Sequence, residues 1–167
     1  MTYQTINPAT GECVASFESW TASQLETALA HVSDITPSWA ATSLAERCRL
    51  LVRLAEVVRA EQETLAQMVT LEMGKLIHES RAEVEKCAQG CEYYAEQAAN
   101  FIADEIIETD AGKSLVAHQP LGTVLAVMPW NFPLWQVFRF IAPTLVAGNT
   151  GLLKHASNVP QCALAIE

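Results

Sequence analysis

The sequence predicts an α/β protein in which a helical N-terminal part is followed by the start of a doubly wound parallel sheet. Two observations support this prediction. Residues 121–167 spell strand, helix, strand, helix, which is the order that opens such a sheet. Residues 21–101 instead carry apolar side chains at helical spacing. Strands joined through a helix are expected to be parallel, so their carboxyl ends should meet at one edge, where ligands bind in such folds.

The first element is predicted to be a β-hairpin. Residues 3–6 and 13–17 have the composition of short strands, and Asn7-Pro8 and Thr10-Gly11 between them supply turn residues. Nothing before the hairpin resembles a secretory signal, because no basic region is followed by an apolar run.

Two capping signatures then predict where helices begin. Thr21 and Gln24 have the spacing of a capping box that opens a short helix, and Ser43 and Glu46 repeat the signature more clearly. Further helices are expected at residues 61–73, ended by Gly74, and at residues 76–101.

The pattern changes after Asp110. The run "SLVAHQ" is typical of a strand, and "GTVLAVM" at residues 122–128 is apolar enough to predict a strand buried on both faces. A helix should follow, with Pro133 near its first turn and Gly148 as its stop. The runs "TGLLKH" and "VPQCALAIE" complete the pattern with another short buried strand and the beginning of a helix.

Composition excludes several classes of function. The formal net charge is −9 with only 10 Lys and Arg, so no basic patch for nucleic acid is visible. No apolar run reaches membrane-spanning length. The five cysteines are scattered and lack the partners of a zinc site, so we expect reduced thiols, no metal and a cytoplasmic protein.

Asn131 is the first candidate functional residue. It lies in "VMPWNFPLW", between a predicted buried strand and the following helix. Its amide could donate a hydrogen bond to an oxygen that becomes negative during a reaction, which is the role of an oxyanion-hole donor. Asn131 could equally cap the helix, as asparagine often does. Position alone favours the cap.

Of four further polar residues, three have two possible interpretations each. Lys154 ends the second predicted strand, where it could reach a ribose hydroxyl or phosphate or simply be solvated. Ser157 could donate to the same group or cap the last helix. His155 is expected to be structural. Arg139 is alone in an apolar segment and requires an anion, either a ligand or a carboxylate of the fold. The glycines here do not form the G-x-G-x-x-G fingerprint, so no standard pyrophosphate loop is predicted.

The segment "PLGTVLAVMPWNFPLWQVFRFIAPTLVAGNTGLLKHASNVP" closely resembles the aldehyde dehydrogenase superfamily. The "PWNFP" turn followed by "AGNTGLLKHAS" is highly specific, and "INPATGE" and "LEMGK" match as well. The resemblance covers the whole chain and is strongest to NAD(P)-dependent succinate-semialdehyde dehydrogenases. It implies an aldehyde dehydrogenase-like α/β fold and oxidation of a small aldehyde with NAD or NADP.

The resemblance also implies roles for individual residues. Asn131 matches the asparagine that stabilises the oxyanion formed when a thiolate attacks the aldehyde. Met128, Pro129 and Trp130 match residues that line the nicotinamide-ribose region. Lys154 matches the lysine that binds the adenosine ribose or its phosphate.

Three further positions are informative: Ser157 bears on the cofactor, Arg139 bears on the substrate, and His155 departs from the family pattern. Ser157 replaces a glutamate that NAD-preferring members often carry, which makes NADP use plausible. His155 departs from the more usual proline. Arg139 matches an arginine implicated in holding the substrate carboxylate of succinate-semialdehyde dehydrogenases.

By the same resemblance, the catalytic cysteine and the general-base glutamate lie beyond this sequence. We expect residues 1–102 to hold the hairpin and helices, 103–120 a bridging strand region, and 121–167 the first part of the cofactor sheet. The expected function is that of the N-terminal part of a homo-oligomeric enzyme, inactive and unstable alone. A non-catalytic chain that pairs with full-length subunits is the alternative, and an independent nucleotide-binding module is a weaker one.

Overall fold

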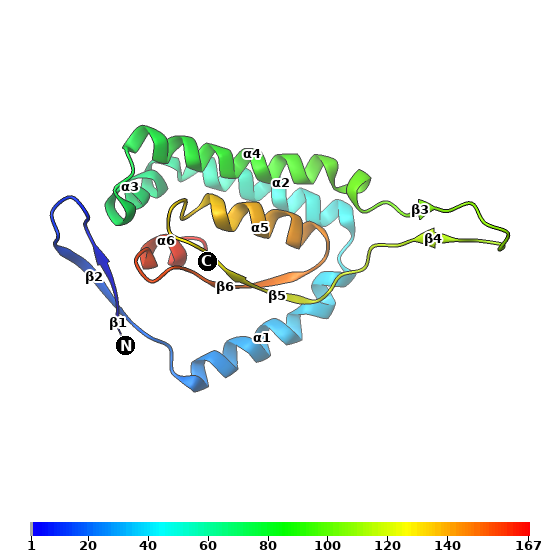
Figure 1. Cartoon of the computed structure of the whole chain (residues 1–167), viewed down its shortest axis with the longest axis horizontal. Helices are drawn as coiled ribbons and strands as arrows, with labels where there is room; N and C mark the ends of the chain where they lie inside the picture. The colour runs from blue at the N-terminus through cyan, green and yellow to red at the C-terminus, as the bar shows by residue number, and fades with distance from the viewer. Residues whose placement is uncertain (1) are drawn as a thin grey trace.

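The computed structural model describes residues 2–167, which form six helices and three two-stranded sheets. In chain order the elements are β1 (Thr2–Ile6), β2 (Cys13–Glu18), α1 (Ala22–Ala41), α2 (Leu44–Ala60), α3 (Gln62–Met73), α4 (Ile77–Phe101), β3 (Glu105–Ile106), β4 (Leu115–Val116), β5 (Thr123–Val127), α5 (Trp135–Val146), β6 (Thr150–Lys154) and α6 (Pro160–Leu164). Figure 1 shows their arrangement. The α/β class is confirmed, and the predicted elements occur in the predicted order, with one further strand, β3, that was not predicted.

The N-terminal hairpin forms as predicted. β1 and β2 pair antiparallel, with Tyr3 opposite Phe17. Asn7 organises the turn, because its carbonyl accepts from Gly11 N at 2.7 Å and its side chain accepts from Ala9 N at 2.9 Å. Gly11 has a φ of 75°, which favours glycine at that position.

Both predicted helix starts are confirmed, but the bonds differ. Thr21 forms a complete capping box with Gln24 at the start of α1. Ser43 caps α2 by accepting from Glu46 N at 3.3 Å, whereas the Glu46 carboxylate pairs with Arg49. The expectation of a short first helix was wrong, because α1 has 20 residues and continues past Pro37.

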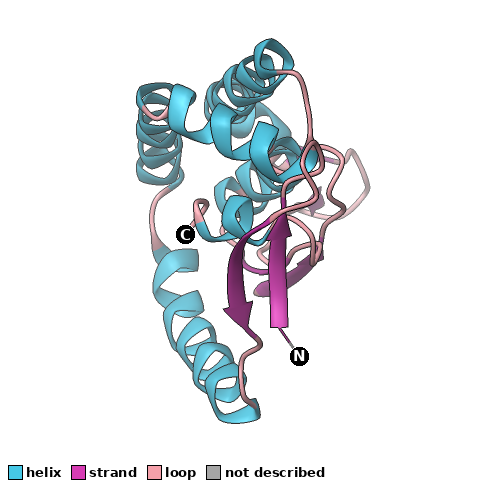
Figure 2. Ribbon diagram, turned by 90° about the vertical axis from the view of Figure 1, so that its left-hand side faces the viewer, coloured by secondary structure: helices cyan, strands magenta, loops and turns pink. Residues whose placement is uncertain are grey.

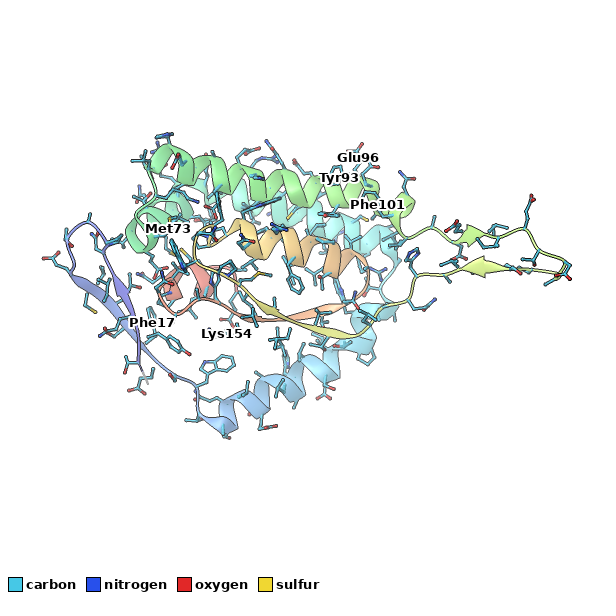
Figure 3. The ribbon with its side chains drawn as sticks, viewed as in Figure 1. Phe17, Met73, Tyr93, Glu96, Phe101 and Lys154 are labelled. Atoms are coloured by element: carbon cyan, nitrogen blue, oxygen red, sulfur yellow. The ribbon has the colours of Figure 1, made fainter. Side chains whose placement is uncertain are left out.

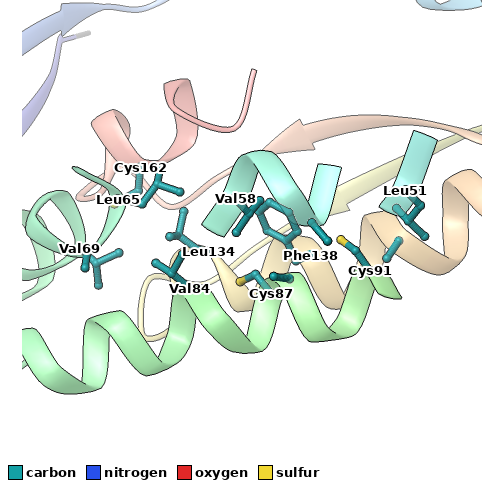
Figure 4. Packing of buried hydrophobic residues seen from close by; sticks show 14 of the residues in the cluster. Leu51, Val58, Leu65, Val69, Val84, Cys87, Cys91, Leu134, Phe138 and Cys162 are labelled. Carbon is teal, nitrogen blue, oxygen red and sulfur yellow. The ribbon is translucent and has the colours of Figure 1, made fainter. Parts of the chain in front are cut away.

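The hydrophobic core lies where α2, α3, α4 and α5 meet (Figure 4). Each helix contributes small or branched side chains at helical spacing, so the helices approach closely. The buried face of α4 includes Cys87 and Cys91, one turn apart. The largest contributions that Figure 4 labels come from Leu51, Val58, Leu65, Val69, Val84, Leu134 and Phe138.

β5 and β6 form the predicted parallel pair, with α5 as the crossover between them. α5 packs on this pair from one side, and α1 contacts both strands from below in Figure 1. Thr36 of α1 bonds to Thr150 at 2.6 Å and to Thr123 at 3.0 Å. The view in Figure 2 shows α1 extending away from the other helices.

The expectation that the run 122–128 is buried on both faces was wrong for this chain. Leu125 and Val127 of β5 are 63% and 67% exposed, while Ala126 is buried. Side chains alternate across a strand, so Leu125 and Val127 share a face with Thr123; α1 reaches this face at Thr123 and leaves Leu125 and Val127 exposed.

The region 103–120 forms an extended arm that projects from the body (Figure 1). The predicted strand at "SLVAHQ" is reduced to β4, and it pairs antiparallel with β3, which sequence reasoning did not identify. Ile106 is 66% exposed and Val116 is also exposed.

None of the helices within residues 2–167 combines the length and the apolar character needed to span a bilayer.

Candidate functional site

The predicted site lies at the carboxyl edge of the β5–β6 pair. Val127 is the register partner of Lys154, and Met128 N donates to Lys154 O at 3.1 Å. The turn formed by residues 128–133 and the segment 154–157 therefore leave the sheet side by side. This confirms that the two strand ends share one edge, which is where the opening prediction placed a ligand.

Asn131 is exposed at this edge and does not cap α5. Helix α5 begins after Leu134, which provides no side-chain cap. Among the described residues, the Asn131 amide has no hydrogen-bond partner. The structure thus contradicts the cap interpretation, and the amide is available to a group outside the chain.

The cap of α5 comes from a distant carboxylate that sequence reasoning missed. Oε1 of Glu83, on α4, accepts from Leu134 N at 2.9 Å and from Trp135 N at 3.0 Å. Glu83 is buried, and its negative charge lies at the positive end of the α5 dipole. The helix N-terminus that could otherwise hold a phosphate is therefore already occupied by an internal anion.

Lys75 completes the charge arrangement behind the turn. It follows Gly74, whose φ of 76° ends α3, and its side chain is buried. Its ammonium forms a salt bridge with the other oxygen of Glu83, and it lies 3.7 Å from the centroid of the Phe132 ring. A buried lysine is stabilised in this way by one anion and one aromatic face.

His155 links the two segments of the site. Its Nδ1 accepts from Ala156 N at 2.7 Å, so the proton lies on Nε2, which donates to Pro133 O at 2.7 Å. The ring is buried. The prediction that His155 is structural is confirmed, and Pro133 lies just before α5, near its first turn as predicted.

The N-terminus of α6 is likewise capped by a carboxylate from another helix. The buried carboxylate of Glu72, on α3, accepts from Gln161 N at 2.9 Å and from Cys162 N at 2.8 Å, and also from the Thr5 hydroxyl. The N-cap residue of α6 is Val159. Ser157 is therefore not the cap, and that alternative was wrong.

Lys154 and Ser157 expose their polar groups beside the turn. Neither side chain has a hydrogen-bond partner among the described residues, and Figure 3 marks Lys154 at the end of β6. Trp130 is 50% exposed and Pro129 is exposed, while Met128 is half-buried. The edge thus offers an ammonium, a hydroxyl and an apolar surface, with no carboxylate among residues 154–158.

Arg139 is exposed on α5, although its sequence neighbours are apolar. The buried side chains of this helix are Val137, Phe138, Ala142 and Val146, so Arg139 lies off the core face. No carboxylate within residues 2–167 pairs with it. The alternative of a structural ion pair is contradicted in the described part of the chain.

The five thiols do not suit a nucleophile at this site. Burial raises the pKa of Cys87 and Cys162 well above the ordinary range, and raises that of Cys91 to about 12. Burial also raises the pKa of half-buried Cys48. Cys13 is exposed, but it lies on β2 of the hairpin. Because the thiolate is the reactive form, the three buried thiols are poor nucleophiles, and burial also disfavours the thiolate of Cys48. In residues 2–167 no cluster of His, Cys, Asp or Glu could hold a metal ion.

Glu72, Glu83 and Lys75 are the functional neighbours that sequence reasoning missed. One signal was available. Glu72 follows Leu65 and Val69 on the apolar stripe of α3, and Glu83 shares the stripe of α4 with Cys87. A carboxylate at a core position indicates a buried partner.

Comparison with known proteins gives consistent similarities. The model of the "Aldehyde dehydrogenase family" matches residues 1–167. The succinate-semialdehyde dehydrogenase of Mycobacterium leprae, whose name specifies NADP(+), is 50% identical over 167 residues, which is 98% of this chain and 36% of the relative. The corresponding protein of Mycobacterium avium is 48% identical over 170 residues, with the same two shares.

A solved structure shows the same likeness. The succinic semialdehyde dehydrogenase of Streptococcus pyogenes, in complex with NADP+, superposes with a TM-score of 0.94 and 37% identity, over 98% of this chain and 36% of that one. This chain therefore spans little more than a third of the length of the relatives it matches.

Proposed function

The chain belongs to the aldehyde dehydrogenase family, and we propose that it forms the N-terminal part of an enzyme that oxidises succinate semialdehyde to the carboxylic acid with NADP or NAD. The observation that carries the proposal is the exposed, unpartnered Asn131 amide beside Lys154 at the carboxyl edge of the sheet. The names of the relatives, which specify succinate semialdehyde and NADP(+), support the same reading.

In this proposal Asn131 acts on the carbonyl oxygen of the aldehyde. When a thiolate adds to the carbonyl carbon, that oxygen gains a negative charge, and the Asn131 side-chain N–H donates to it. No acceptor among the described residues has to be displaced from the amide before it donates to the oxyanion. The thiolate would come from outside residues 1–167, since Cys87, Cys91 and Cys162 are buried in the core, Cys48 lies half-buried on α2 and Cys13 lies on the hairpin.

The residues at the edge fit a nicotinamide cofactor. Lys154 and Ser157 would bind the adenosine ribose or its phosphate, and Met128, Pro129 and Trp130 would border the nicotinamide ribose. When bound, the cofactor accepts a hydride from the substrate carbon. No carboxylate among residues 154–158 would repel a 2′-phosphate, so the donor set accommodates NADP as well as NAD.

Arg139 is the residue in this chain that we assign to the substrate carboxylate. Its guanidinium is exposed and has no carboxylate partner among the described residues, so it is free to take an external one. The complete enzyme with Arg139→Ala should show a raised KM for succinate semialdehyde and an unchanged KM for butanal, which has no charge.

Arg139→Lys is the matched control, since it keeps the positive charge and should lose less affinity for succinate semialdehyde than Arg139→Ala does. Equal losses on the charged and the uncharged aldehyde would refute the assignment of Arg139. They would leave the role of Asn131 untouched.

We further propose that residues 1–167 alone neither oxidise aldehydes nor fold stably. The exposed Leu125 and Val127 face of β5 and the poorly nucleophilic buried thiols support this. Aldehyde-dependent NADP+ reduction by the purified chain, or a cooperative thermal unfolding transition, would refute it.

The β3–β4 arm is the region that we assign to assembly of the complete enzyme. Both of its strands have an unpaired edge among the described residues, and Ile106 and Val116 are exposed. The same arm supports the second candidate, a non-catalytic chain that pairs with full-length subunits. Co-purification of this chain with the full-length subunit, abolished by Val116→Pro, would favour that candidate.

A further inference from the structure

We propose that Glu83, acting with Lys75, is a positioning residue for Asn131: it fixes the turn of residues 129–133 that presents the amide. The inference rests on the proposed function, in which Asn131 donates to the oxyanion. Glu83 itself touches no reacting atom in this scheme. It acts through the Phe132 ring and the backbone amides of Leu134 and Trp135, all of which follow Asn131 in the chain.

The first step is the hold on the C-terminal side of the turn. The two α5 amides that bond to Glu83, those of Leu134 and Trp135, are three and four residues beyond Asn131. Both bonds go to one oxygen, and that carboxylate is buried on α4, a helix anchored in the core. Pro133 has no N–H, so Leu134 provides the first donor of this helix end.

The second step is the contact that fixes Phe132, the residue next to Asn131. Lys75 bonds to the remaining oxygen of Glu83 and lies against the face of Phe132. Phe132 is 43% exposed and would otherwise be free to turn. The ring therefore takes its position from an ammonium that is itself held by Glu83.

The third step is a further contact on the same C-terminal side of Asn131, where His155 donates to Pro133 O. Residues 132 to 135 are thus each fixed by a group from elsewhere in the fold, whereas Asn131 has no partner of its own. The direction of its amide depends on these holds. Small errors in such a direction reduce rate strongly, since a misplacement of about 1 Å can cost on the order of a hundredfold.

The test is a double-mutant cycle in the complete dehydrogenase, measured as kcat for succinate semialdehyde and KM for NADP+. Glu83→Gln keeps an oxygen for the two amides but removes the charge that holds Lys75. Phe132→Leu removes the ring instead and leaves the α5 cap intact, so it decides the matter if Glu83→Gln does not fold. Glu79→Gln is the matched control. Glu79 is exposed on α4 and, like Glu83 and Phe132, lines a cleft of about 300 Å³.

We expect Glu83→Gln to lower kcat about tenfold with KM for NADP+ unchanged, and to change kcat less than about twofold once Asn131→Ala is present. Glu79→Gln should leave kcat unchanged. An equal loss in both backgrounds, or no loss from Glu83→Gln, would overturn the positioning role. If Asn131→Ala alone leaves kcat unchanged, the proposed function fails instead, and the two failures are thereby distinguished.

Discussion

Removing the Glu72 carboxylate should release the N-terminus of α6 and the hairpin together. This side chain is buried and accepts from Gln161 N, Cys162 N and the Thr5 hydroxyl. Thr5 and Cys162 are fully buried, so water cannot easily replace their acceptor, whereas Gln161 is only half-buried. A buried donor left unsatisfied costs about 1–3 kcal/mol, so two such donors in Glu72→Ala should cost about 4 kcal/mol.

Glu72→Gln separates this explanation from a general loss of packing. The amide has nearly the same volume but keeps only one acceptor oxygen, so it should satisfy Gln161 N and Thr5 and fail at Cys162 N. One lost acceptor predicts a cost of about 2 kcal/mol, half that of the alanine variant. Glu63→Gln is the control, because Glu63 is exposed on the same helix and bonds to Arg81 instead.

Hydrogen–deuterium exchange of the complete protein, read on peptides that cover residues 158–166, measures this cost locally. A loss of about 2 kcal/mol corresponds to roughly thirtyfold faster exchange at Cys162. The Ala variant should exchange faster still, and the Glu63 control should match the wild type. Equal exchange in the Ala and Gln variants, or no change in either, would refute the reasoning.

Two further predictions concern titratable groups. Arg81 lowers the pKa of Glu63 to about 2, and a carboxylate whose folded pKa is lowered stabilises fully above its unfolded value and loses that contribution as the pH falls. The bridge between α3 and α4 should therefore weaken from about pH 4.5 down to about 2, and a carboxyl titration by NMR with a Glu63 midpoint near 4.5 would contradict this. Cys13, which is exposed, should react first with iodoacetamide at pH 8, as read by mass spectrometry. Labelling of Cys87, Cys91 or Cys162 in the absence of denaturant would contradict their burial.

Local signals in the sequence were sufficient for most helix and strand starts. Thr21 and Ser43 cap their helices because the partner amide is three residues away, so the information is contained in one short stretch. Gly74 ends α3 for an equally local reason, its positive φ. The parallel strands were predictable because short apolar runs alternated with a helix.

The caps that Glu83 and Glu72 provide to other helices could not be predicted from such local signals. Glu83 and Leu134 are 51 positions apart, and Glu72 and Cys162 are 90 apart. The place of each glutamate on an apolar stripe indicates a buried partner, but only the packing of α4 against α5, or of α3 against α6, reveals which group it is. For the same reason Asn131 was first favoured as a cap, because the carboxylate that fills that role lies on another helix.

The exposure of one face of β5 was not predicted for a related reason. The apolar composition of β5 correctly indicated a strand, but burial also depends on what covers Leu125 and Val127, which a local pattern does not specify. Arg139 shows the reverse. Its apolar neighbours in sequence suggested that Arg139 needs an anion inside the protein. Helical spacing instead places it off the core face that carries Phe138.

The central claim is that the Asn131 amide stabilises an oxyanion at the carboxyl edge of this sheet. The most direct test is the rate of NADP+ reduction with succinate semialdehyde by the complete enzyme and its Asn131→Ala variant. We predict that kcat falls by on the order of a hundredfold to a thousandfold, the usual cost of removing one oxyanion donor, with NADP+ affinity unchanged. An Asn131→Ala enzyme with the kcat of the wild type would contradict the claim.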